Sequence, residues 1–182
     1  MKTYIALLRG INVSGQKIIK MELLRKILAE LGFENIRTYI QSGNIIFESK
    51  SLPVLKLETK IAAKIEEHFG FTVPVTIVTP EELLEIINKN PYANETLTDA
   101  TQPYVSFLSE IPKAAHSEIF RSIDFKGDTF ICIDKTLYLW YANGAGTSKL
   151  SNATIESKLK LRSTVRNWKT VLKLHQLATA NN

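Results

Sequence analysis

Residues 36–47, IRTYIQSGNIIF, decide the fold of this chain because they predict a β-hairpin. Ile36–Gln41 carries β-branched and aromatic residues typical of a strand, and Ile45–Phe47 returns as a second strand. Between them, Ser42-Gly43 or Gly43-Asn44 forms a tight turn, where glycine supplies the backbone freedom that the turn needs.

The segments on either side of the hairpin alternate between helix and strand patterns. Before it, Thr3–Leu8 predicts a short buried strand, and apolar residues recur at helical spacing from Met21 to Leu31. After it, apolar residues from 57 to 69 predict a second helix, and Val73–Val78 predicts a strand. The order β-α-β-β-α-β is that of a split βαβ, or ferredoxin-like, unit.

The second half of the chain predicts a partial copy of this unit. Thr79-Pro80-Glu81-Glu82 begins a connecting helix, with threonine as N-cap and glutamate three residues later. A strand, a helix and a hairpin then follow at Tyr104–Leu108, 115–123 and 130–141. Two helices, at about 148–160 and 164–178, close the chain, so that a helix takes the place of the last strand.

These patterns predict an α+β protein with two ferredoxin-like (split βαβ) subdomains, the second one partial, with antiparallel sheets that carry helices on one face. Residues 1–90 form the first subdomain and the following helix. The polar residues 91–103 form a linker, and residues 104–182 form the second subdomain with its basic C-terminal helix.

Composition indicates a soluble globular protein. The chain has 182 residues, of which 45% are hydrophobic, and this is enough for a substantial core. The one cysteine, Cys132, lies in an apolar run that predicts a buried structural thiol, so the chain needs no oxidising compartment. The N-terminus has no signal-peptide pattern, and no window approaches the length of a membrane span. We expect a cytoplasmic protein with no membrane partner.

The positive charge is concentrated at the C-terminal end. From Lys149 onward there are seven basic residues against one acidic residue, Glu156, which gives a charge of +6. The first 148 residues carry −1, and the net charge of the chain is +5. Four of them have spacings of four, three and four, which predicts one face of the last helix; they are Arg162, Arg166, Lys169 and Lys173. Such a stripe can contact phosphates, or it can be an ordinary solvated face. On the other side of this helix, Trp168 predicts core packing.

Three motifs carry a resemblance to a known family. They are Ala6–Val13 (ALLRGINV), Thr38–Asn44 (TYIQSGN) and Thr164–Thr170 (TVRNWKT). Together they resemble the bacterial domain-of-unknown-function family 1697 over nearly the whole chain. The resemblance implies a bacterial cytosolic protein and one shared architecture, and it supplies no reaction. Ser14 departs from the glycine expected there, whereas Gly15 is retained.

The predicted topology gathers polar side chains at one edge of the first sheet. In a ferredoxin-like unit, the end of the first strand and the turn of the hairpin meet at the same edge. That edge would carry Arg9, Gly10, Asn12, Gln41, Ser42 and Asn44. These groups can bind an anionic ligand, with help from helix N-terminal amides. Equally, asparagine and serine are common turn residues that bond to nearby backbone, and the two interpretations remain open.

Residues of the second half can join this site. Arg166 and Asn167 are able to turn toward the first-half loops, and Tyr39 or Trp168 offers a stacking face. Lys149 ends the glycine-containing loop 143–149, which lies between a strand and a helix as phosphate-binding loops do. That loop lacks the P-loop ending, and a plain loop with Thr147 or Ser148 as N-cap also explains it.

No catalytic or metal signature stands out. His68, His116 and His175 show no metal-ligand spacing, and no serine lies in a nucleophile elbow, so we predict no metal site and no cofactor.

The leading hypothesis is a protein that binds a phosphorylated metabolite, nucleotide or nucleic acid. The alternatives are a metal-independent enzyme acting on a phosphorylated small molecule, and a structural or protein-interaction module. The predicted ligand-binding residues are Arg9, Asn12, Tyr39, Gln41, Ser42, Asn44, Lys149, Arg166 and Asn167. The sequence leaves the catalytic residues, the oligomeric state and any hinge between the halves open.

Overall fold

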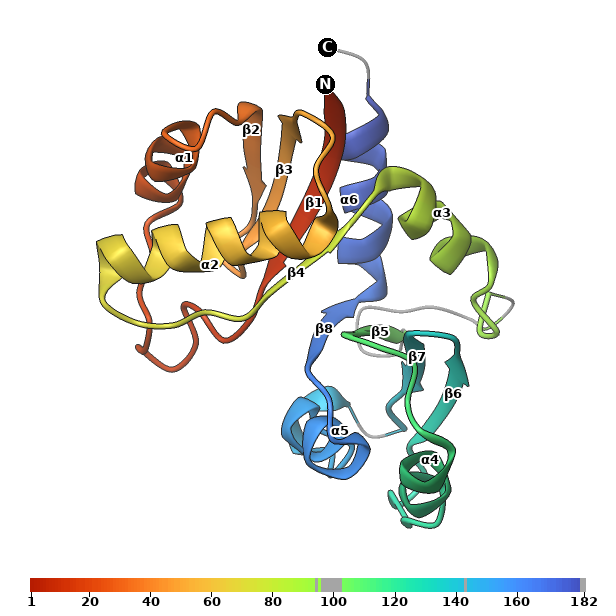
Figure 1. The fold of residues 1–182 in the computed structure, drawn as a ribbon. Helices are drawn as coiled ribbons and strands as arrows, with labels where there is room; N and C mark the ends of the chain where they lie inside the picture. The colour runs from red at the N-terminus through yellow and green to blue at the C-terminus, as the bar shows by residue number, and fades with distance from the viewer. Residues whose placement is uncertain (94, 96–102, 143, 181–182) are drawn as a thin grey trace. The chain divides into compact units, whose positions relative to one another are not determined.

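The computed structural model describes residues 1–93, 95, 103–142 and 144–180 (Figure 1). The chain divides into two compact units, Met1–Glu85 with Lys173–Asn182, and Ile86–Leu172. The division falls within helices α3 (Pro80–Asn88) and α6 (Trp168–Thr179). The sequence pattern places the boundaries at 1–90 and 104–182, with all of the last helix in the second subdomain. Most of the predicted linker, 91–103, lies outside the described residues.

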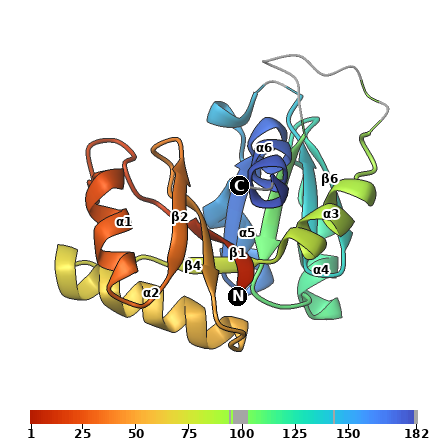
Figure 2. The same ribbon diagram turned by 90° about the horizontal axis from the view of Figure 1, so that it is seen from above.

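The first unit is a complete βαββαβ arrangement. Its elements are β1 (Lys2–Leu8), α1 (Met21–Ala29), β2 (Glu34–Tyr39), β3 (Asn44–Ser49), α2 (Val54–Phe69) and β4 (Val75–Val78). All strand pairs are antiparallel, in the order β2-β3-β1-β4, and α1 and α2 lie on the same side of the sheet (Figure 2). The ferredoxin-like prediction for this half is therefore confirmed.

The core of the first unit forms where one face of the sheet meets these helices. Phe47 of β3 stacks on Phe33 at a centroid distance of 4.5 Å and on Tyr4 at 5.7 Å. From α2, the fully buried Leu57 and Ile61 repeat at a spacing of four, which places both on the side of the helix that packs against the sheet. The helix ends at Gly70, whose left-handed φ of 75° closes the last turn.

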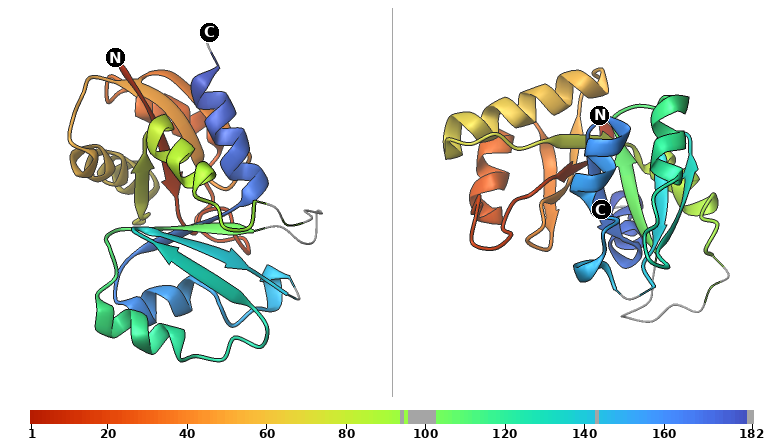
Figure 3. Two further views of the ribbon diagram at one scale, coloured as in Figure 1. Left: turned by 90° about the vertical axis from the view of Figure 1, so that its right-hand side faces the viewer. Right: turned by 90° about the horizontal axis from the view of Figure 1, so that it is seen from below.

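The second unit repeats this order. Its elements are β5 (Tyr104–Leu108), α4 (Ala114–Arg121), β6 (Thr129–Ile133), β7 (Thr136–Trp140), a short 3-10 helix (Ala145–Thr147), α5 (Asn152–Leu159) and β8 (Ser163–Asn167). The antiparallel strands lie in the order β6-β7-β5-β8. Figure 3 (left) shows α4 and α5 together on one face of this sheet.

The prediction that the second unit is partial is wrong, because the last strand is present. Residues 163–167, predicted as the start of a helix, form β8 and pair with β5 from Leu108↔Ser163 to Tyr104↔Asn167. Helix α5 ends at Lys160 in a left-handed conformation (φ 59°), and the β-branched Thr164 and Val165 follow in extended form.

The predicted basic stripe on one helical face is also wrong for the same reason. Arg162 precedes β8 and Arg166 lies within it, so only Lys169 and Lys173 belong to α6. A spacing of four, three and four residues has no common face when part of the segment is a strand.

The two units share backbone hydrogen bonds at equivalent positions. After β1, Leu8 N donates to Gly43 O (2.8 Å) and Arg9 N to Pro74 O (3.1 Å). After β5, Leu108 N donates to Lys135 O (2.9 Å) and Ser109 N to Arg162 O (2.9 Å). In each unit the end of the first strand is therefore tied to the hairpin turn and to the segment before the last strand. We call this region the loop edge of the unit.

No helix in the described part of the chain combines the length and the apolar character needed to cross a membrane.

Candidate functional site

The first loop edge brings together the residues predicted to meet there. β3 lies between β1 and β2, with the pairs Leu7↔Asn44 and Tyr39↔Asn44, so β1 and β2 end at the same edge of the sheet, one on each side of β3. The side chain of Asn12 reaches across from the loop after β1 and donates to Gln41 O (2.8 Å). Arg9 through Asn12 and Tyr39 through Asn44 thus converge as the topology implies, although they lie about 30 positions apart in sequence.

Asn12 acts as a clasp between two loops. Its Nδ2 donates to Ile19 O (3.0 Å) as well as to Gln41 O, and its Oδ1 accepts from Ile19 N (2.8 Å). Its φ of 53° lies in the left-handed region, which asparagine tolerates better than most residues. Both amide hydrogens are therefore occupied by backbone carbonyls, as the turn interpretation of this residue expects.

Asn44 and Ser42 organise the hairpin turn. Asn44 is fully buried, and its Nδ2 donates to Tyr39 O (3.1 Å) and Ser42 Oγ (2.9 Å). Gly43 has a φ of 75°, and a Cβ there would lie 2.6 Å from Leu8 Cβ. The tight turn predicted at this position is confirmed, and these polar groups hold its shape. A direct contact with a ligand stays a prediction for both side chains.

Cations and exposed side chains surround this clasp. Arg9 is half-buried, Gln41 is exposed, and Lys20 is exposed. Lys17 Nζ donates to Thr72 O (2.7 Å) and lies 5.9 Å from the centroid of the Phe71 ring. The three segments that build the edge, residues 9–20, 38–47 and 70–76, contain no aspartate or glutamate. The edge therefore presents positive charge without a neighbouring carboxylate from its own loops.

Sequence reasoning missed an apolar component of the same edge. Val13, Ile18 and Ile40 are 59%, 56% and 50% exposed. Each is adjacent in sequence to a residue of the Asn12 clasp, whose hydrogen bonds join Asn12, Ile19 and Gln41. The available signal was the run QKIIK at 16–20, in which apolar and basic residues share one loop.

The backbone of this edge is held in uncommon conformations. Ser14, Lys17 and Ile40 have φ values of 51°, 46° and 50°. For a β-branched residue such as Ile40 the left-handed region is a true outlier, with a cost of about 1–2 kcal/mol. Strained residues of this kind cluster at binding sites, where the surrounding structure holds them.

The predicted phosphate-binding loop at 143–149 is held by a carboxylate of the chain itself. Asp128 Oδ1 accepts from Ala142 N (2.8 Å), and Asp128 Oδ2 accepts from Ser148 Oγ. A carboxylate at these donors disfavours a second anion. The N-cap of α5 is Ser151, whose Oγ accepts from Thr154 N (3.2 Å), and not Thr147 or Ser148 as predicted. Asn143 lies outside the described residues, and Lys149 is exposed.

Arg166 and Asn167 belong to β8 of the second unit. Arg166 Nη1 donates to Val165 O (2.9 Å), and burial lowers the pKa of its guanidinium to about 10, so it is cationic at neutral pH. Asn167 Oδ1 accepts from Thr170 N (2.8 Å) and so caps the start of α6. Trp168 is 6% exposed, which confirms its predicted packing role.

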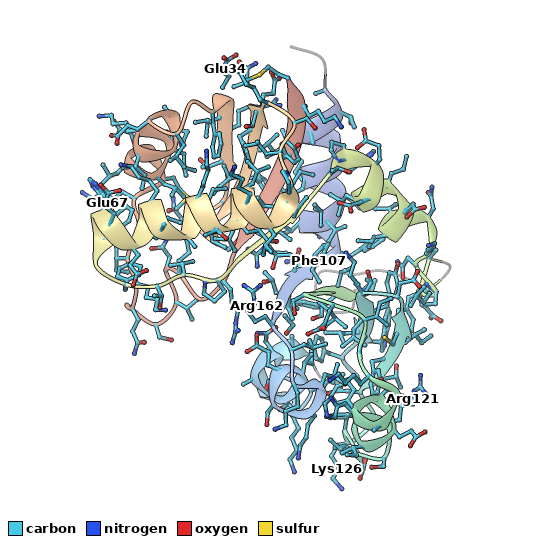
Figure 4. The ribbon with its side chains drawn as sticks, viewed as in Figure 1. Glu34, Glu67, Phe107, Arg121, Lys126 and Arg162 are labelled. Atoms are coloured by element: carbon cyan, nitrogen blue, oxygen red, sulfur yellow. The ribbon has the colours of Figure 1, made fainter. Side chains whose placement is uncertain are left out.

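The second unit also contains a half-buried cysteine and an open hollow. Cys132, predicted to be buried, is half-buried; burial raises the pKa of its thiol, and the nearby Arg121 opposes this shift. An open hollow of about 610 Å³ at the second loop edge is lined by Ser109, Glu110, Glu156, Lys160, Leu161 and Arg162. Figure 4 labels Arg121 and Arg162.

No group of three histidine, cysteine or acidic side chains able to hold a metal occurs among the residues that the structure describes.

Comparison with known proteins gives a family and a structural relative. A solved structure, described as the structure of conserved bacterial protein SP0830 from Streptococcus pneumoniae, is similar with a TM-score of 0.70 and 25% identity; the match covers 97% of this chain and 98% of that one. No curated protein matches the chain. The family model described as "Protein of unknown function (DUF1697)" matches residues 1–138. Since that match spans most of the chain, the protein belongs to the DUF1697 family.

Proposed function

We propose that this protein binds an anionic ligand at the loop edge of its first unit. The observation that carries the proposal is the charge of that edge. Its three segments supply Arg9, Lys17 and Lys20 and contain no acidic residue, although acidic residues are common elsewhere in the chain. An anion at this edge would meet complementary charge and no repulsion from the loops that surround it.

The clasp residues support this role by fixing the loops before a ligand arrives. Asn12 and Asn44 use their amide hydrogens within the edge, so they position the backbone and leave ligand contact to other groups. Arg9 adds a guanidinium charge with five N–H donors, and Lys17 still has donor capacity beyond its one bond to Thr72. Preformed loops lower the entropic cost of binding.

The exposed apolar side chains favour a ligand that is more than a bare phosphate. Val13, Ile18 and Ile40 flank the clasp and can pack against a planar or apolar group. A nucleotide or a short single-stranded nucleic acid combines phosphate charge with a stackable base, and Tyr39 at the end of β2 can contribute to stacking.

The direct test is a binding measurement against charge-reversed variants. Fluorescence anisotropy with a labelled single-stranded RNA and with labelled ATP, at low and moderate salt, should show saturable binding that weakens as salt rises. Lys20→Glu should weaken binding about tenfold. Lys60→Glu, an equal charge change at an exposed site on α2 of the same unit, is the matched control and should change affinity by less than about twofold.

Two outcomes would contradict the proposal. One is the absence of binding to either probe at low salt. The other is equal weakening by Lys20→Glu and Lys60→Glu, because that would show a response to net charge and not to this edge.

A further inference from the structure

The outer strand of the second sheet, β6, carries no charged residue, no proline and no bulge, three features that often protect a sheet edge from pairing. β6 is the terminal strand in the order β6-β7-β5-β8. Its five residues, TFICI, include no charge and no proline, and its register with β7 has no bulge. By contrast, β2 at the edge of the first sheet contains Glu34 and Arg37 and has a register shift between them. Charges and bulges are the devices that discourage pairing at an edge, and β6 has neither.

A hollow borders β6. It has a volume of about 450 Å³, and its lining includes four consecutive residues of the strand, from Thr129 to Cys132. Successive side chains of a strand point to opposite faces of the sheet. Since the hollow touches all four, the backbone of β6 borders it as well as side chains of the strand.

The hairpin register leaves backbone groups of β6 directed away from β7. Ile133 and Thr136 flank a two-residue turn, so they form a hydrogen-bonded pair, as do Ile131 and Tyr138. The alternate residues, Phe130 and Cys132, therefore direct their N–H and C=O groups away from β7. Within the described chain no strand pairs with that side. An extended backbone is the partner that satisfies such a row of groups.

The side chains around the hollow specify what the added strand should carry. Phe125 and Phe130 form an apolar wall, with ring centroids 6.0 Å apart. Arg121, the last residue of α4, lines the hollow and acts electrostatically on Cys132, and Figure 4 shows it labelled beside α4. The hollow thus offers a cation near Cys132 and an aromatic surface near Phe130.

We propose that β6 binds an extended peptide segment of another protein, which adds to the second sheet as an antiparallel strand. The peptide residue opposite Cys132 is acidic and pairs with Arg121. The residue two positions later, opposite Phe130, lies on the same face and is apolar, so the recognised pattern is acidic–x–apolar. This site lies in the second unit and is independent of the anion site proposed for the first.

The experiment is a selection from a random library of linear peptides of about nine residues displayed on phage, with the full-length protein as target. The enriched peptides should share the acidic–x–apolar pattern. Methylating the peptide nitrogens that face β6 should abolish binding, because these N–H groups donate to the strand. In hydrogen exchange, the amides of Phe130 and Cys132 should slow by about tenfold or more when peptide binds.

Charge-swapped variants test the role of Arg121. Arg121→Glu should weaken the selected peptides about tenfold and should regain affinity for peptides in which lysine replaces the acidic residue. Lys158→Glu, an equal charge change at an exposed position of α5, is the matched control and should change affinity by less than about twofold.

Four results would overturn the proposal: no enrichment over an uncoated surface, binding that N-methylation leaves intact, exchange protection at residues outside β6, or self-association. In the last case the chain would sediment as a dimer with the amides of β6 protected, and a second copy would be the occupant of this edge.

Discussion

Replacing Asn12 tests whether the clasp at the first loop edge stabilises the fold. Asn12→Ala removes three hydrogen bonds, with Ile19 N, Ile19 O and Gln41 O. A net value of about 0.5–1.5 kcal/mol per bond, reduced for the more exposed one, gives a loss of about 2 kcal/mol. The left-handed φ of 53° adds about 1 kcal/mol for alanine. We expect the free energy of unfolding to fall by about 3 kcal/mol.

Two companion variants separate these contributions. Asn12→Gly loses the same hydrogen bonds but accepts the backbone conformation, so it should be more stable than Asn12→Ala by about 1 kcal/mol. Asn12→Asp keeps the shape of the side chain but places a carboxylate oxygen against the carbonyls of Ile19 and Gln41. It should therefore be at least as destabilised as the alanine variant at neutral pH.

Urea unfolding followed by circular dichroism is the assay, because both tryptophans, Trp140 and Trp168, lie in the second unit and would not report on the first. The comparison uses midpoints at constant slope, since a changed slope would signal a departure from two-state behaviour. The reasoning is refuted if Asn12→Ala lowers stability by less than about 0.5 kcal/mol, or if the glycine variant is no more stable than the alanine variant.

Three other changes have expected outcomes. Gly43→Ala should lower the thermal midpoint by well over 5 °C, because its Cβ would lie 2.6 Å from Leu8 Cβ. Gly10→Ala faces open space, so it should be destabilised only by the left-handed φ of its backbone. Asn167→Ala should cost about 1 kcal/mol in urea unfolding through loss of the cap on Thr170 N; an unchanged midpoint would contradict that role. Burial raises the pKa of Tyr138 to about 12, above its unfolded value near 10, so the neutral phenol stabilises the fold below pH 10 and this contribution is lost as pH rises toward 12. Stability between these pH values should fall more steeply in the wild type than in Tyr138→Phe, and parallel curves would contradict the assignment.

Local sequence signals predicted the structure correctly where no second pattern in the same segment favoured a different element. The turn at Gly43 and the capping box at Thr79 and Glu82 are both present, the latter as reciprocal bonds between Thr79 N and Glu82 Oε2 (2.8 Å) and between Glu82 N and Thr79 Oγ1 (3.2 Å). The missed strand β8 is a case of competing signals. Basic residues at helical spacing outweighed the β-branched pair Thr164-Val165, and pairing with β5 decided the outcome.

The candidate site was predictable in position and not in role. Topology alone brought the end of β1 to the hairpin turn, so the meeting of Asn12 and Gln41 followed from strand order. The amide of Asn12 bonds to backbone carbonyls and does not point to solvent. This depends on the loop conformation, which is set by left-handed residues at positions 12, 14 and 17. No periodic pattern encodes those angles.

The shared backbone bonds of the two units make their different side chains informative. The position after the first strand is Arg9 in one unit and Ser109 in the other. Ser109 Oγ accepts from Arg162 N (3.2 Å), so this side chain bonds to the backbone of its own loop edge. The second loop edge also includes Glu110 and Glu156, and the Oε1 of Glu156 accepts from Ser163 N (2.8 Å). A duplicated scaffold with an acid-free edge in one copy and a mixed-charge edge in the other is expected to bind anions only at the first. Introducing a glutamate at the first loop edge, as in Gln41→Glu at an exposed position, should therefore weaken anion binding. Glu110→Lys should leave binding within about twofold, and equal effects of the two changes would contradict this division of roles.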